Sequence, residues 1–307
     1  MKKLCVLLLL ITVSLLITGC GINTIFYDNA DEYVKGAGVI SEEITELEIE
    51  WIAGNVEVKF HDADNVVIEE DGVDVASCPL YHRFKDGKLS IKYGKSGTRL
   101  NTNFGKELTV RLPRTTLLDS LKISSASADL AITETASRNA EISSASGAVT
   151  LNNSSVDGKL NVSTASGRIM LNDTRVGGKL GASTASGDIS VKLMGTCNTI
   201  ELESTSGRIN TTLEDTRDVS VSTVSGLVIL RAYVLPNTIE AESVSGGVSV
   251  YLPEGEPFSF EADSVSGSVN CEFGAAKKGD VYTVDGGKTD YSFESVSGSI
   301  QIKKFKR

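Results

Sequence analysis

The sequence predicts an all-β protein, a parallel β-solenoid (β-helix) of about nine to ten rungs of ~20 residues with an N-terminal β cap. Three observations predict this fold. A Ser-x-Ser-Gly motif recurs through the C-terminal two thirds of the 307-residue chain. Its spacing is nearly constant, as in solenoids. Apolar and polar residues alternate on both sides of each motif, with the period of a β-strand.

The motif is numbered from its glycine, position 0, which is replaced by Ala128 in the first copy. Successive copies lie 19, 20, 20, 20, 19, 20, 21 and 31 residues apart. Position −1 is serine in every copy and position −3 is Ser or Thr. Glycine suits a sharp bend, and the hydroxyls can bond backbone or the next rung. We interpret the corners as scaffold; they are Ser146, Gly147, Ser166, Gly167, Ser186, Gly187, Ser206, Gly207, Ser225, Gly226, Ser245, Gly246, Ser266, Gly267, Ser297 and Gly298.

Strands are expected before and after each corner. Positions −7, −5 and +2 are apolar, position +4 is mostly so, and the residues between them are polar or variable. Twenty residues do not bury such an apolar face alone, whereas parallel stacking of successive copies does. The pattern therefore predicts two short strands in each rung, with inward and outward side chains alternating.

An atypical rung precedes the repeat. In "LEIEWIAGNVEVKF", Leu47 and Gly54 match positions −7 and 0, and Trp51 replaces the hydroxyl. We expect Trp51 to cover the open end of the core, because terminal repeats are atypical. The strand-like segments that follow, with a turn at Asp86-Gly87, predict an antiparallel start that blocks edge pairing. Asp285-Gly286, within the longest spacing, predicts a second hairpin tip.

The N-terminus has the features of a lipoprotein signal. Lys2 and Lys3 precede the apolar run "LCVLLLLITVSLLI", and "ITGC" ends at Cys20. This end resembles the lipobox of bacterial lipoproteins, which implies lipidation of Cys20, secretion, and anchoring to the outer face of the cytoplasmic membrane. The expected organisation is signal peptide 1–19, lipidated N-terminus and linker 20–40, β cap and first rung 41–115, solenoid 116–302 and basic tail 303–307.

Composition excludes several other classes of function. The net charge of −10 argues against a nucleic-acid partner. After Cys5 and Cys20, three widely spaced cysteines remain (Cys78, Cys197 and Cys271), without the spacing of a disulfide framework or a metal site. With only two histidines and no phosphate-binding glycine loop, we expect no cofactor and no metal.

One predicted face of the solenoid is acidic. Carboxylates gather at positions −4 and −6 of the later rungs, where like charges on adjacent strands repel each other. A bound cation such as Ca²⁺, or a cationic peptide, would relieve that repulsion; a solvated face that keeps the rod soluble is the alternative. The candidate residues are Glu201, Glu203, Glu240, Glu242, Glu261, Asp263 and Glu294.

The lipobox, "ITELEIEWIAGNVEVKF", "ELTVRLP" and the Ser-x-Ser-Gly rungs together resemble a bacterial family of adhesin-type β-helix proteins, long catalogued as a domain of unknown function. The resemblance covers roughly residues 40 to 302. It implies a right-handed parallel β-helix on the surface of mostly Gram-positive bacteria, without catalytic residues, and some members are linked to envelope-stress or antimicrobial-peptide responses. The expected role is an adhesin-like or envelope-stress interaction module that binds an unknown protein, a cell-wall polymer or a cationic peptide.

Two alternatives stay open. A polysaccharide-acting enzyme would need paired carboxylates in a groove, and only the row of Asp129, Arg168, Asp188 and Arg208 has a suitable mixture. The near-constant period leaves no long lateral loops to wall a cleft. The protein could instead be a scaffold or spacer for a sensing partner in the membrane.

Overall fold

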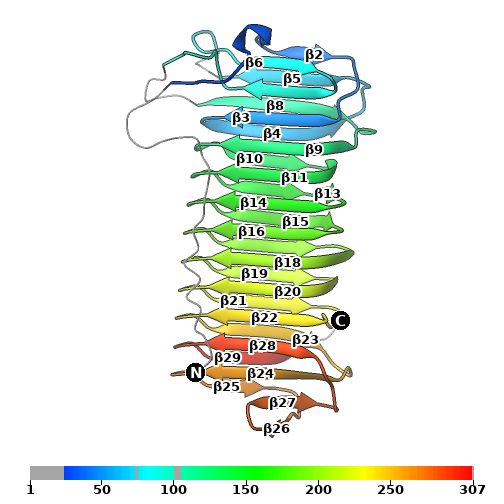
Figure 1. Cartoon of the computed structure of the whole chain (residues 1–307), viewed down its shortest axis with the longest axis vertical. Helices are drawn as coiled ribbons and strands as arrows, with labels where there is room; N and C mark the ends of the chain where they lie inside the picture. The colour runs from blue at the N-terminus through cyan, green and yellow to red at the C-terminus, as the bar shows by residue number, and fades with distance from the viewer. Residues whose placement is uncertain (1–23, 73–74, 100–104, 306–307) are drawn as a thin grey trace.

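The chain folds into an elongated stack of coils, each made of a strand, a corner and a second strand (Figure 1). This computed structural model describes residues 24–72, 75–99 and 105–305. Strands before the corner form one sheet, called here the leading sheet, and strands after it form the trailing sheet. Inward side chains of both sheets make a single apolar core. The all-β prediction is therefore confirmed.

The leading sheet is built mainly of parallel strands, with antiparallel strands at its two ends. Its spatial order differs from the chain order at both ends. The order is β1 (Val34–Lys35), β6 (Tyr81–Lys85), β7 (Lys88–Lys92), β3 (Glu46–Trp51), β9 (Leu118–Ser125), β11 (Ala136–Ser144), β14 (Lys159–Thr164), β16 (Lys179–Thr184), β18 (Thr196–Ser204), β20 (Asp215–Thr223), β22 (Thr238–Ser243), β28 (Asp290–Ser295), β24 (Phe258–Ser264), β27 (Val281–Val284) and β26 (Ala276–Lys278).

The trailing sheet follows the same plan. Its order is β2 (Gly38–Ile40), β5 (Val66–Asp71), β8 (Lys106–Pro113), β4 (Gly54–His61), β10 (Asp129–Thr133), β12 (Val149–Asn152), β15 (Ile169–Val176), β17 (Ile189–Leu193), β19 (Ile209–Leu213), β21 (Val228–Ala232), β23 (Val248–Pro253), β29 (Ile300–Phe305) and β25 (Val269–Cys271). The short β13 (Ser155–Val156) pairs with β11 and β15, and η1 (Ala30–Glu32) is a single 3₁₀ turn.

Consecutive coils are in register, which places equivalent repeat positions side by side. Leu160 of β14 pairs with Leu180 of β16, and Val149 of β12 pairs with Ile169 of β15. The apolar side chains at these positions are buried, and the residues between them face outward. The alternation read from the sequence therefore identifies the inward face of each coil correctly, since it reflects the two-residue period of a strand.

The first coil is not the end of the stack. Strand β3 lies between β7 and β9, and β4 lies between β8 and β10. The expectation that Trp51 covers an open end is therefore wrong. A further coil, formed by β7 and β8 and called here the outer coil, lies beyond it. The Trp51 side chain is 3% exposed, and its ring lies 4.8 Å from that of Tyr93, which follows β7. Antiparallel β5 and β6 pair with the outer coil, and the turn between β6 and β7 has positive φ at Asp86 and Gly87.

The C-terminal end shows the same interleaving. The last coil, β28–β29, lies between the two coils that precede it, so red strands separate yellow from orange ones (Figure 1). The hairpin β26–β27 pairs with the outer edge of β24. Its own turn holds Gly279, whereas Asp285 and Gly286 form a separate turn with positive φ that leads toward β28. The prediction of a hairpin tip at Asp285-Gly286 is therefore wrong: the hairpin turn precedes β27, and Asp285-Gly286 follows β27.

The boundaries expected near the chain ends lie partly outside the described structure. Cys20 and the signal segment precede the described residues. Strand β29 continues to Phe305, so Lys303 and Lys304 belong to the last coil instead of a separate tail. No helix within residues 24–72, 75–99 and 105–305 has the length and apolar character needed to cross a bilayer.

Candidate functional site

The corner glycines are packed against the neighbouring coil. A Cβ built on any glycine from Gly147 to Gly298 at position 0 would lie 1.7–2.1 Å from the carbonyl oxygen at position 0 of the adjacent coil. No other residue fits at that distance, so glycine is needed for stacking as well as for bending. The same series of contacts confirms that Gly298 lies between Gly246 and Gly267.

The buried hydroxyl of the corner is at position −3. In all nine copies its oxygen accepts a hydrogen bond from the N–H at position 0, at 2.8–3.1 Å. In seven copies the same hydroxyl donates to the position-0 carbonyl of the adjacent coil, at 2.8–3.4 Å. These hydroxyls are therefore committed to backbone groups, which favours the scaffold interpretation over a nucleophile.

The serines at position −1 have a lesser part in the corner. They are exposed, and some donate to backbone carbonyls, as Ser225 does to Thr205 and Ser245 does to Val224. Of the corner pairs proposed from the sequence, the glycine is structurally essential and the serine is peripheral. The sequence did contain the signal for the buried hydroxyl, since position −3 is Ser or Thr in every copy.

A buried ion pair closes the N-terminal end. Lys106 holds position 0 of the outermost coil, next to Gly54. Its ammonium pairs with the carboxylate of Glu70 and donates to the carbonyls of Cys78 and Tyr93, with both partners of the pair at most 1% exposed. The ammonium also lies 4.9 Å from the ring of Trp51. A long side chain fits at position 0 only here, where no further coil follows, so this cluster has a structural role.

The acidic residues share the outward face of the leading sheet. Because the last coil is interleaved, Glu294 lies between Glu242 and Asp263, and the three form a continuous row on adjacent strands. Ser222 separates Glu203 from Glu242 in the same row. We call Glu203, Glu242, Glu294 and Asp263 the acidic row. At position −6, Glu240 and Glu261 flank Ser292.

These carboxylates lack compensating cations. Of the seven, only Glu201 has an ion pair within the described chain, with Lys179 at 2.6 Å. Partial burial raises the pKa of Glu242, and the neighbouring charges of Glu240 and Glu294 raise it further. Partial burial likewise raises the pKa of Glu203, helped by the charge of Glu201. The face therefore carries uncompensated negative charge that a cationic partner would stabilise.

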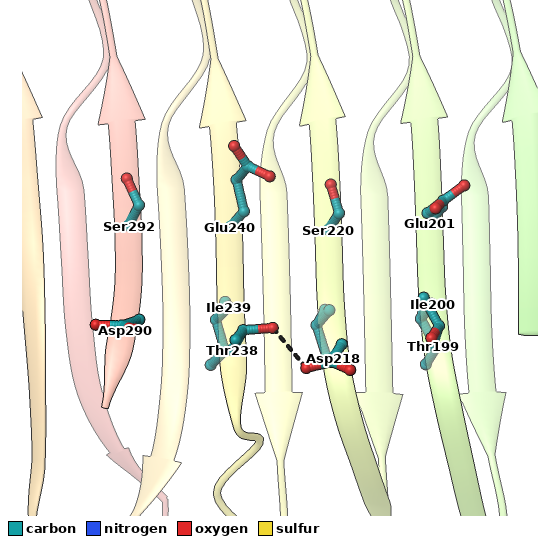
Figure 2. A pocket seen from close by; sticks show the side chains of 11 residues that line it. Thr199, Ile200, Glu201, Asp218, Ser220, Thr238, Ile239, Glu240, Asp290 and Ser292 are labelled. Carbon is teal, nitrogen blue, oxygen red and sulfur yellow. Dashed lines mark hydrogen bonds between the residues drawn. The ribbon is translucent and has the colours of Figure 1, made fainter. Parts of the chain in front are cut away.

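A shallow depression of about 290 Å³ lies beside this row. Its lining comes from β18, β20, β22 and β28, and Figure 2 shows Glu201, Ser220, Glu240 and Ser292 in line across these strands. On the other side, Thr238 donates a hydrogen bond to Asp218 at 2.8 Å. Neither here nor elsewhere in the described residues do three His, Cys, Asp or Glu side chains converge as metal ligands. The face therefore offers a broad charged surface instead of a chelating pocket.

The mixed row on the trailing sheet has another arrangement. Asp129 accepts a hydrogen bond from the N–H of Ala148 at 2.7 Å, and Asp188 accepts one from the N–H of Arg208 at 2.9 Å. Both carboxylates therefore bond the backbone of the adjacent coil. These bonds fix the register of adjacent coils, which favours a structural role for both carboxylates.

Comparison with known proteins finds one matching family and several solved structures of similar fold. The model of the Toastrack DUF4097 family matches residues 44–303. The crystal structure of a "putative adhesin" from Parabacteroides merdae is 14% identical, with 89% of this chain and 96% of that chain covered and a TM-score of 0.51. A "putative adhesin" from Bacteroides fragilis is 16% identical, with 89% and 97% covered and a TM-score of 0.43. A "putative lipid binding protein" from Parabacteroides distasonis is 17% identical, with 88% and 97% covered and a TM-score of 0.46. No curated protein matches the chain.

Proposed function

The chain belongs to the Toastrack DUF4097 family, and we propose that it is a non-catalytic binding module of the cell envelope that recognises a cationic partner with its acidic face. The lipobox ending at Cys20 supports anchoring by lipid at the outer face of the cytoplasmic membrane. The module would serve as an adhesin-like or envelope-stress interaction protein, with a cationic peptide or a basic protein segment as its ligand.

The acidic row carries this proposal. Glu242, Glu294 and Asp263 lie on three consecutive parallel strands, which are about 4.8 Å apart. Like charges at that spacing destabilise a sheet. These three carboxylates are nevertheless adjacent, and no lysine or arginine of the described chain forms an ion pair with any of them. The carboxylates of the earlier coils differ in this respect. There Lys88 pairs with Glu48.

A scaffold of this kind suits an extended ligand. Each coil adds one side chain to every outward-facing row of the leading sheet, so this sheet offers a regularly spaced surface along the stack axis. Its stiffness also limits the entropy that binding removes from the protein, since the strands are already paired on both edges. Salt should weaken the complex strongly, because the attraction comes from partly exposed charges.

A binding assay on vesicles tests the proposal. The full chain, held in neutral phosphatidylcholine vesicles, is mixed with a fluorescent lysine-rich peptide, and bound peptide is measured by sedimentation at low and moderate salt. The variant Glu242→Gln/Asp263→Asn/Glu294→Gln should lose most of the binding. A control variant with the same change in net charge, Glu42→Gln/Glu43→Gln/Asp64→Asn, removes exposed carboxylates elsewhere and should retain it.

Two outcomes would contradict the proposal. Equal losses in both variants would mean that net charge alone, and not the acidic row, attracts the peptide. Absence of binding by the wild-type chain, also to isolated cell wall, would favour a spacer that supports a partner protein in the membrane.

A further inference from the structure

A ridge of valines runs along the corner of the last four coils. Position −2 of these coils is valine, and the side chains of Val224, Val244 and Val265 are 47%, 40% and 76% exposed. Val296, half-buried, completes the set. Backbone hydrogen bonds fix their order: the N–H of Val244 donates to Thr223, that of Val296 to Ser243, and that of Val265 to Ser295. We call these four residues the valine ridge; it is about 14 Å long at ~4.8 Å per coil.

The corner itself does not require this bulk. The equivalent position is alanine in four earlier coils (Ala126, Ala145, Ala165 and Ala185), which have the same hydrogen-bonded corner. The valines lie in the bend and leave part of each side chain exposed, most of all Val265. A continuous row of exposed apolar residues is a candidate contact surface when it lies beside other features that fit a ligand.

The valine ridge lies beside the acidic row. Position −2 lies in the bend directly after the strand, which ends at position −3. In the coil of β22, Glu242 is half-buried and Val244 is exposed, and the buried Ser243 lies between them. Glu242 and Val244 share one coil, and Glu294 and Val296 share the next. In the last three coils of the chain, valine at position −2 coincides with a carboxylate at position −4; Val224 lies beside Ser222 instead. The two rows therefore form one surface that is apolar along one margin and anionic along the other.

Charge decides what this surface can bind. An anionic lipid surface would be repelled by the adjacent carboxylates. A second copy of the chain, related by a two-fold axis across the ridge, would bring two acidic rows together, and an axis along the ridge would leave both rows without a cationic partner. A protein segment with both apolar and cationic side chains satisfies both margins at once.

We propose that the valine ridge and the acidic row together form the docking strip for a cationic amphipathic segment of a partner protein or peptide. This inference rests on the proposed function and adds to it the requirement for apolar side chains in the ligand. Burial of the valines contributes affinity that salt does not screen, while the carboxylates select a basic partner. The acidic face alone would make no distinction between an amphipathic peptide and a purely polar one of equal charge.

The experiment uses two probe peptides of equal length and charge, one alternating leucine with lysine and one alternating serine with lysine. Their affinities for the full chain in neutral phosphatidylcholine vesicles are measured by fluorescence anisotropy at moderate salt, with protein-free vesicles as background. We expect the leucine peptide to bind at least tenfold more tightly. Replacing all four ridge valines with alanine should remove that advantage and leave the serine peptide unchanged.

The alanine variant reproduces the corner of the earlier coils, so it should fold and unfold cooperatively, with a melting temperature only modestly below that of the wild type. A gain control, Ala145→Val/Ala165→Val/Ala185→Val, builds a ridge beside serines at position −4 and should not strengthen binding of either peptide. Binding gained there would overturn the paired strip, because the valines alone would then suffice.

The remaining outcomes separate the two proposals. If both peptides bind the wild type equally and the alanine variant changes neither, the ridge inference is wrong and the acidic-face function stands. If neither peptide binds, both fail. If the alanine substitutions abolish self-association or attachment to anionic vesicles but leave peptide binding unchanged, the occupant is a second copy or a lipid surface, and the docking strip for a peptide is refuted.

Discussion

The substitution Thr184→Val tests the central claim about the corners. The Thr184 hydroxyl accepts a hydrogen bond from the N–H of Gly187 at 3.0 Å and donates to the carbonyl of Gly167 at 3.3 Å. Its side chain is fully buried. Valine preserves the shape but leaves two buried backbone groups without this partner, each at a cost of about 1–3 kcal/mol. The added methyl offsets part of that cost, so we expect a loss of about 2–4 kcal/mol in unfolding free energy.

The assay is equilibrium urea unfolding followed by far-UV circular dichroism. Comparison is made with Ser186→Ala, which removes an exposed hydroxyl of the same corner with no hydrogen bond in the described structure. We expect this control to change the unfolding free energy by less than about 0.5 kcal/mol. If Thr184→Val were as mild as Ser186→Ala, the hydroxyl bridge between coils would contribute nothing measurable, and our account of the conserved spacing between hydroxyl and glycine in each copy would be refuted.

Three further predictions follow from the same structure. Gly187→Ala should prevent close stacking and unfold the chain at a much lower temperature, whereas Gly274→Ala, with open space around its Cα, should be tolerated in the same melting experiment. Lys106→Met should destabilise the chain by about 3–5 kcal/mol in urea, since it strands the buried carboxylate of Glu70, and adding Glu70→Gln should recover part of the loss. Glu242→Gln should raise stability at neutral pH by about 0.2–1 kcal/mol. Because burial and neighbouring carboxylates raise the folded-state pKa of Glu242, the wild type loses stability as pH rises through that pKa. The advantage of the glutamine should therefore vanish below the ordinary glutamate range, and an advantage that persisted in acid would contradict this cause.

Several features of the fold were readable from the sequence because they are local. A glycine every twenty residues, with alternating apolar residues on both sides, specifies a strand, a bend and a strand wherever it occurs. The inward faces around Leu160 and Val149, for example, follow from that pattern alone. The acidic positions −4 and −6 were also correctly placed on one face, since outward positions in register form rows.

The order of the terminal coils was not readable. Each coil presents similar apolar residues and a similar corner to its neighbours, so a parallel pairing of β28 with β22 or with β24 alone would look equally good in sequence. In the structure β28 pairs with both strands. The segment that leads from β27 to β28 packs against β24 there, with Gly287 against the backbone of Phe258. The hairpin β26–β27 occupies the other edge of β24, so β28 takes the edge that faces β22. This order makes Glu294 a neighbour of Glu242.

By itself, the sequence determined the repeating unit: its strands, its corner and the side on which each residue lies, because these depend on the two-residue period of strands and the absence of a Cβ in glycine. Only the tertiary structure decided which coils are neighbours. Both the acidic row and the valine ridge depend on that decision, since Glu294 and Val296 complete them from a segment more than thirty residues away from Asp263 and Val265. The physical reason is that the pairing of distant, nearly equivalent strands is settled by the packing at the ends of the stack, which no single repeat encodes.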